Sequence, residues 1–111
     1  MATHALFPFS EIAPGTARRV EVGPLAIALV RVADDVYAVG DTCSHADVSL
    51  SEGFVESGNC MIECVRHGSL FNLKTGEPES LPAVRPVPVY EVEVVAGQVI
   101  LRLSDDEESR E

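Results

Sequence analysis

Short apolar segments recur along the chain, and residues that favour turns separate them. Residues 18–22 and 89–95 alternate between polar and apolar side chains, which is the pattern of a strand with one buried face. Residues 25–32 form a nearly continuous aliphatic and β-branched run, which also favours a strand. Helical periodicity is not sustained for more than two turns, and only residues 50–52 suggest one short turn of helix. The pattern therefore predicts an all-β domain.

Turn signals indicate how these strands pair. The acidic turn Asp34-Asp35 joins two members of a meander, and Ser57-Gly58-Asn59 and Ala96-Gly97-Gln98 each join the strands of a hairpin. The turn at residues 74–77 indicates a further hairpin. Together the signals predict strands at residues 4–9, 18–22, 25–32, 36–39, 54–55, 61–63, 70–73, 89–95 and 99–103.

Length and composition agree with one small domain. The chain has 111 residues, 46% of them apolar, with no Trp, seven Pro and eight Gly, which suits short strands and tight turns. The last eight residues hold five acids and one Arg. We therefore expect a folded domain over residues 1–103 and a solvated, disordered acidic tail over residues 104–111.

The charge balance excludes two classes of partner. Eighteen acidic residues against eight basic ones give a formal charge of -10, which opposes binding to nucleic acid or to an anionic membrane.

The longest apolar run, residues 25–30, is too short to span a bilayer, and the N-terminus lacks the pattern of a secretory signal. Three cysteines do not make a disulfide framework. These features predict a cytoplasmic protein.

Two Cys/His clusters, each placed after a predicted strand, carry the candidate chemistry. Cys43-Ser44-His45 forms the first, and Cys64 and His67 form the second. A single tetrahedral zinc is one interpretation, but one intervening residue is fewer than zinc ligand pairs usually have. A two-iron cluster is the other: Cys43 and Cys64 would hold one iron while His45 and His67 hold the second.

The spacing resembles the signature of the Rieske 2Fe-2S family. Eighteen residues separate Cys43-x-His45 from Cys64-x-x-His67-Gly68. Further segments are similar to small bacterial Rieske ferredoxins of ring-hydroxylating dioxygenase systems, and residues 6–103 fit such a protein. They are Asp41-Thr42-Cys43-Ser44-His45, Leu50-Ser51-Glu52-Gly53, Ile62-Glu63-Cys64, Phe71-Asn72-Leu73-Lys74-Thr75-Gly76 and Leu81-Pro82-Ala83.

The resemblance implies a fold and a site. The fold is a stack of three antiparallel sheets, with two cluster-binding loops and a proline loop around Pro82 at one tip. The site holds one 2Fe-2S cluster, bound by Cys43, His45, Cys64 and His67. Ser69 is expected to donate a hydrogen bond to a cluster sulfur, and the charge of Arg66 to raise the reduction potential.

Departures from the family pattern bear on the potential. Respiratory Rieske proteins have a disulfide between their loops, but Val48 and Arg66 stand at those positions here. Phe71 replaces the tyrosine of high-potential members. We therefore expect a potential in the lower part of the Rieske range, which spans roughly -150 to +300 mV.

The resemblance also implies a function. The protein is expected to carry single electrons from a flavin-dependent reductase to a terminal oxygenase, and to catalyse no reaction on a substrate itself. Two alternatives are the small Rieske-like subunit of a nitrite reductase and a zinc-binding interaction module. Docking is expected at the cluster tip, through exposed side chains of Val48, Leu50, Arg66 and Leu81.

Other reactive side chains have simpler interpretations. Cys60 is expected to pack in the core on the strand that leads to Cys64, on the same face as Ile62. His4 is expected at the surface or on a strand edge. Several acids could suggest a carboxylate catalytic site, but we interpret them as turn and surface residues: Asp34, Asp35, Asp41, Asp47 and Glu63.

Overall fold

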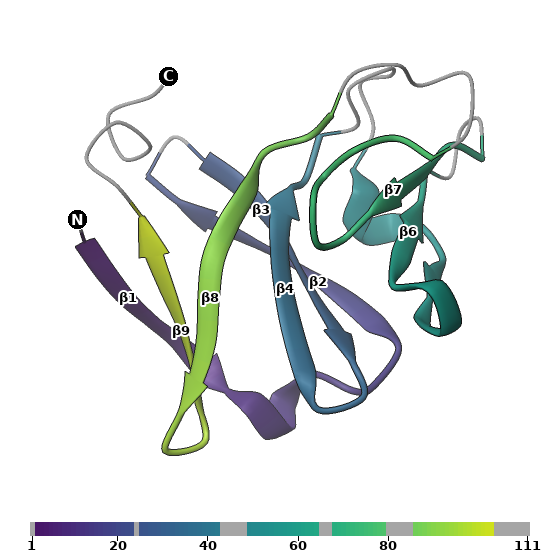
Figure 1. The fold of residues 1–111 in the computed structure, drawn as a ribbon. Coiled ribbons are helices and arrows are strands. Elements are labelled where there is room, and N and C mark those ends of the chain that lie inside the picture. The colour runs from purple at the N-terminus through teal and green to yellow at the C-terminus, as the bar shows by residue number, and fades with distance from the viewer. Residues whose placement is uncertain (1, 24, 43–48, 65–67, 80–85, 104–111) are drawn as a thin grey trace.

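The structure is a computed structural model that describes residues 2–23, 25–42, 49–64, 68–79 and 86–103. It confirms an all-β domain, in which nine strands lie at or close to their predicted positions (Figure 1). The strands are β1 (Ala2–Pro8), β2 (Thr16–Val22), β3 (Leu25–Val32), β4 (Asp35–Gly40), β5 (Val55–Glu56), β6 (Met61–Glu63), β7 (Leu70–Asn72), β8 (Val89–Val95) and β9 (Gln98–Leu103). Three short 3-10 helices accompany them in the described ranges: η1 (Phe9–Glu11), η2 (Leu50–Glu52) and η3 (Ser57–Asn59).

The described strands form two antiparallel sheets. One has six strands in the order β1-β9-β8-β4-β3-β2, and the other has the order β5-β6-β7. The resemblance implied three sheets. The difference arises at β8, because this strand pairs with β9 along one edge and also joins β4 through Ala38↔Tyr90 and Val39↔Val89. Two residue pairs thus make the first two expected sheets continuous.

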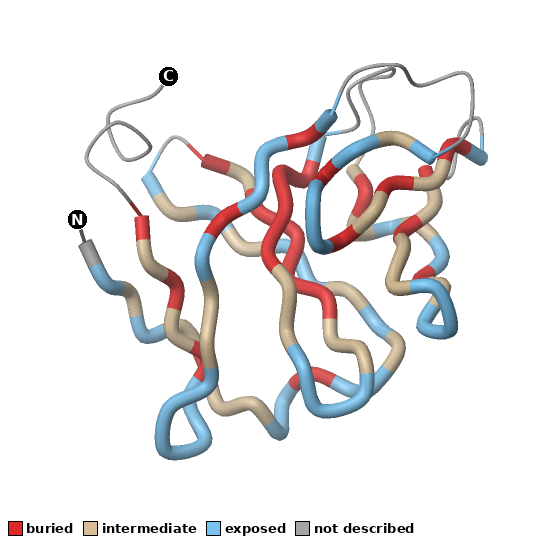
Figure 2. Tube along the Cα trace, viewed as in Figure 1, coloured by how far each residue is buried: buried red, intermediate tan, exposed pale blue. Residues whose placement is uncertain are grey.

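Strand β3 is buried on both faces, which explains its uninterrupted apolar run. Ile27 and Leu29 pack in one core cluster, whereas Ala28 and Val30 pack in a second. Successive side chains of a strand point to opposite faces, so β3 supplies both clusters at once. The first cluster also includes residues of β1, β8 and β9, and the second includes residues of β5, β6 and β7. Figure 2 shows the resulting line of buried residues through the centre of the molecule.

The edges of the large sheet match the sequence expectations. Among the described strands, β1 pairs with β9 alone, which places His4, opposite Leu101, on an edge strand as predicted.

In the part of the chain that the structure describes, no helix has the length and apolar character needed to cross a membrane. The predicted acidic tail, residues 104–111, lies outside the described residues.

Candidate metal centre

Among the four predicted ligands, Cys64 is the one that the structure describes. Cys43, His45 and His67 lie outside the described residues, as do Arg66 and Pro82. The residues on both sides of each segment that carries these residues are described.

Cys64 directly follows β6 and is completely buried. Its backbone N–H donates to the carbonyl of Ser69 at 2.8 Å, and its own carbonyl accepts from the N–H of Gly68 at 2.9 Å. Gly68 has φ 73°, a left-handed conformation that glycine adopts without steric cost. The side of the second loop that returns to β7 is thus held against Cys64. Ser69 is buried as well.

The two ends of the first loop are held together by backbone contacts. Thr42 and Ser49 form an isolated antiparallel bridge across residues 43–48. The N–H of Leu50 donates to the carbonyl of Asp41 at 2.5 Å, and the N–H of Ser51 donates to Oδ1 of Asp41 at 2.9 Å. Asp41 therefore fixes both the segment that precedes Cys43 and the start of η2.

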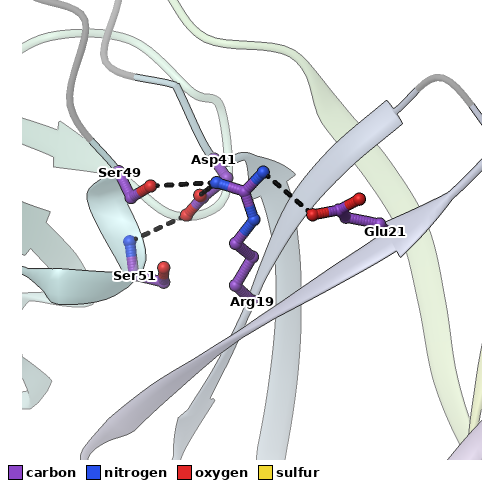
Figure 3. A network of polar contacts seen from close by, with 5 residues as sticks. All are labelled: Arg19, Glu21, Asp41, Ser49 and Ser51. Atoms are coloured by element: carbon purple, nitrogen blue, oxygen red, sulfur yellow. Dashed lines mark hydrogen bonds and ion pairs between the residues drawn. The ribbon is translucent and has the colours of Figure 1, made fainter.

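Arg19, on β2 of the large sheet, contacts residues at both ends of the first loop (Figure 3). Its Nη1 lies 3.0 Å from Oδ2 of Asp41 and 3.0 Å from Oγ of Ser49, and its Nη2 lies 3.1 Å from Oε2 of Glu21. The Asp41 side chain is fully buried, whereas 45% of the Arg19 side chain is exposed. The interpretation of Asp41 as a turn or surface acid is wrong, because its carboxylate accepts from Arg19 and from a backbone N–H inside the protein.

The segment around the predicted proline loop is also anchored at both ends. On one side, the N–H of Glu79 donates to the carbonyl of Leu70 at 2.6 Å, next to an isolated bridge between Phe71 and Pro78. This bridge pairs the two arms of the hairpin that the sequence predicted around residues 74–77. On the other side, the N–H of Val87 donates to the carbonyl of Gly76 at 2.8 Å. A Cβ on Gly76 would overlap the Val87 carbonyl oxygen, so this approach requires glycine.

Residues that flank all three segments meet in one core cluster. Leu50, Cys64, Phe71 and Val87 are buried together in it. A further close approach joins the first two segments, since a Cβ on Gly53 would overlap the carbonyl oxygen of Glu63. The fold thus brings the ends of the two ligand-bearing segments and of the proline-rich segment to one end of the small sheet.

Comparison with known proteins identifies the family of the chain and the group that this site binds. Residues 3–91 match the family described as the Rieske 2Fe-2S domain. The chain belongs to this family. It is 48% identical to the ferredoxin CarAc of Metapseudomonas resinovorans over 91 residues, covering 81% of the chain and 83% of the relative. It is 38% identical to the 3-phenylpropionate/cinnamic acid dioxygenase ferredoxin subunit of Escherichia coli strain K12, and this match covers 88% of the chain and 91% of the relative.

A solved structure agrees with these relatives. The ferredoxin in a complex of reduced oxygenase and oxidized ferredoxin in carbazole 1,9a-dioxygenase superposes with a TM-score of 0.83. It is 44% identical to the chain, and the match covers 89% of the chain and all of that ferredoxin. This Rieske domain therefore carries one 2Fe-2S cluster and is an electron-transfer component, not a catalytic subunit.

The described part of the site fits such a cluster. Iron–sulfur clusters bind Cys thiolates, and in Rieske centres two His replace two Cys on one of the irons. Cys64 provides a thiol shielded from solvent directly after β6, and its backbone is hydrogen-bonded to Gly68 and Ser69. Burial and hydrogen bonding around ligand sulfurs are features that adjust the potential of such centres.

Two sequence expectations near the site need correction. Leu50, expected to be exposed for docking, is fully buried in the cluster that contains Cys64. Its backbone is tied to Asp41, which turns the side chain inward at the start of η2. Cys60 does pack against this cluster and is partly buried, but it precedes β6 instead of lying on it, and its φ of 57° is left-handed.

No sequence pattern indicated the partner of Cys60. The Tyr37 side chain, on β4, hydrogen-bonds to Cys60 and so links the large sheet to the segment that precedes β6. This hydrogen bond, together with burial and the neighbouring charges of Cys60 and Asp35, raises the pKa of Tyr37 to about 12. Sequence reasoning also missed Phe54, whose exposed fraction of 66% is the highest among the large apolar residues that the structure describes.

Proposed function

We propose that the chain carries one electron at a time from a flavin-dependent reductase to the terminal oxygenase of a ring-hydroxylating system. The observation that supports this most is the similarity to a ferredoxin whose structure is known in complex with its oxygenase. The relatives from Metapseudomonas resinovorans and Escherichia coli are also ferredoxins, the second of them a named dioxygenase subunit. These relatives favour a dioxygenase ferredoxin over a nitrite reductase subunit or a zinc module.

We further propose that Cys43 and Cys64 bind one iron and that His45 and His67 bind the other. Reversible one-electron reduction of the histidine-bound iron is the chemistry that the bound cluster supplies. Two neutral imidazoles in place of two thiolates raise the potential above that of plant-type ferredoxins, which lies at about -400 mV. The burial of Cys64 and the anchored ends of the first loop support this assignment.

Three further residues have proposed roles around the cluster. Ser69, buried two residues after His67, is assigned a hydrogen bond to a cluster sulfur. Pro82 is assigned the role of covering the cluster, and the charge of Arg66 is assigned a role in raising the reduction potential. The reductase partner, the cytoplasmic location and a potential in the lower Rieske range stay predictions.

A redox titration of the purified protein tests the function. Dithionite should add one electron per chain, air or ferricyanide should remove it, and the visible spectrum should recover fully. The reduced protein should then reoxidise when an isolated oxygenase component is added under anaerobic conditions. A protein that takes up no electron, or that loses its colour permanently on reduction, would contradict the proposal.

A further inference from the structure

A row of four side chains crosses the small sheet at the end that leads to Cys64. Phe54 accepts, through its carbonyl, the N–H of Glu63 at 2.8 Å, and Glu63 pairs with Leu70. The carbonyl of Leu70 in turn accepts the N–H of Glu79 at 2.6 Å. The row therefore alternates between apolar and acidic residues, in the order Phe54, Glu63, Leu70, Glu79.

This row faces away from the core. The neighbouring residues Val55, Ile62 and Phe71 are buried, and side chains of a strand alternate between its faces. The pairing registers place a second row on the same outer face, one step further from Cys64. Its members are Glu56, Met61, Asn72 and Glu77.

The carboxylates of this outer face are not neutralised by any cation that the structure describes. Elsewhere, Glu11 pairs with Arg18, Glu21 with Arg19, and Glu91 and Glu93 with Arg102. By contrast, four acids of the small sheet form no ion pair with another described residue, although Glu56 accepts a hydrogen bond from Asn59. These acids are Glu56, Glu63, Glu77 and Glu79.

We propose that this outer face is a docking surface for a redox partner protein with a basic surface around an apolar pocket. Phe54, which is 66% exposed, would fill the pocket, since a few anchor side chains buried in pockets of the partner carry most of the binding energy of an interface. The four carboxylates would meet Lys and Arg of the partner and speed its approach. The proposal rests on the electron-carrier function. It adds a second docking surface, on the outer face of the small sheet, to the docking surface predicted at the cluster tip.

The position of this face suits electron transfer. Glu63 immediately precedes Cys64, and its Oε2 lies 3.9 Å from the point that a Cβ on Gly68 would occupy. The first row, through Glu63, therefore borders the segment that carries His67. A second copy of this chain is a poor occupant, because two acidic faces would repel each other.

Ferricytochrome c, a basic haem protein, serves as the probe. The protein is reduced with dithionite, freed of excess reductant and mixed with the cytochrome in a stopped-flow instrument at low and high salt. Two variants remove features of the face: Phe54→Ser, and Glu77→Gln combined with Glu79→Gln. Matched controls are Val95→Ser, at another exposed apolar residue, and Glu11→Gln combined with Glu91→Gln, which changes the net charge equally.

We expect both variants of the face to slow electron transfer at low salt by at least about threefold, and the double variant to weaken its salt dependence. The controls should match the unchanged protein. Equal rates for face and control variants would overturn the docking proposal, and so would a change of oligomeric state in Phe54→Ser. The visible spectrum and the unchanged protein's one-electron transfer test the carrier function separately, because neither depends on where the partner docks.

Discussion

The guanidinium of Arg19 lies 3.0 Å from the fully buried carboxylate of Asp41, two residues before the proposed ligand Cys43. The two residues are 22 positions apart in the sequence, and they connect an edge strand of the large sheet to the first ligand loop. Arg19 also donates to Ser49 at the far end of that loop. One side chain therefore contacts both ends of a segment that has to hold two cluster ligands.

Replacing Arg19 by Gln should destabilise the protein measurably. The buried carboxylate of Asp41 would lose its charged partner and keep the N–H of Ser51 as its described donor. We expect a loss of about 1–3 kcal/mol, seen as a lower thermal midpoint by circular dichroism. Glu11→Gln is the control, because the pair of Glu11 with Arg18 is exposed on both sides and should contribute less than about 1 kcal/mol. Equal midpoints for the two variants would show that the contact with Asp41 contributes little.

Replacing Gly53 by Ala should disturb the approach of the first loop to β6. A methyl group there would overlap the carbonyl oxygen of Glu63, and backbone has to move to make room. The expected cost is at least about 2 kcal/mol, with loss of cluster absorbance on mild heating. Gly58→Ala is a fair comparison, because a Cβ at Gly58 meets nothing within 4 Å. If Gly53→Ala retained both its stability and its colour, the close contact would not be a constraint.

Tyr37 should ionise at a more alkaline pH than an ordinary tyrosine. Its pKa of about 12 lies above the usual 10.0, so the folded state retains a proton that the unfolded state loses. The associated stability is fully present below pH 10 and disappears as the pH rises through 12. The chain has two tyrosines, and the difference in absorbance at about 295 nm between the unchanged protein and Tyr37→Phe isolates this group.

The same titration tests the contact with Cys60. In Cys60→Ala the hydrogen bond is absent, so the pKa of Tyr37 should fall toward its ordinary value. An ordinary pKa of Tyr37 in the unchanged protein, or no difference between the two proteins, would contradict the contact between Tyr37 and Cys60.

Cys60→Ser should keep its full complement of iron. Cys60 lies before β6 and hydrogen-bonds to Tyr37, whereas Cys64 directly follows β6. A hydroxyl in place of a partly buried thiol should cost some stability. Iron and acid-labile sulfide per chain measure the outcome, and a loss of either in this variant would mean that Cys60 is a ligand.

Strand positions were predictable because the order of apolar and polar residues within each strand shows which of its faces are buried in the core. Alternation in β8 and the continuous apolar run of β3 each reflect how many faces of the strand are buried. The short helix at η2 also followed from its local sequence. The Cys/His spacing, in turn, is specific enough to indicate the family by itself.

Features that depend on distant partners could not be predicted in the same way. The burial of Asp41 depends on Arg19, which comes from another strand, and the inward turn of Leu50 depends on Asp41. Likewise, the left-handed backbone of Cys60 and its hydrogen bond to Tyr37 leave no pattern in the sequence. The continuity of the large sheet rests on only two residue pairs between β4 and β8.

The visible spectrum, taken with metal and sulfide content, tests most directly whether two Cys/His loops hold one 2Fe-2S cluster. The purified protein should be reddish brown, with two irons and two acid-labile sulfides per chain. His45→Ala and His67→Ala should each remove this colour, whereas Cys60→Ser should retain it. A colourless protein with stoichiometric zinc, or variants of both histidines that keep the full spectrum, would contradict the account.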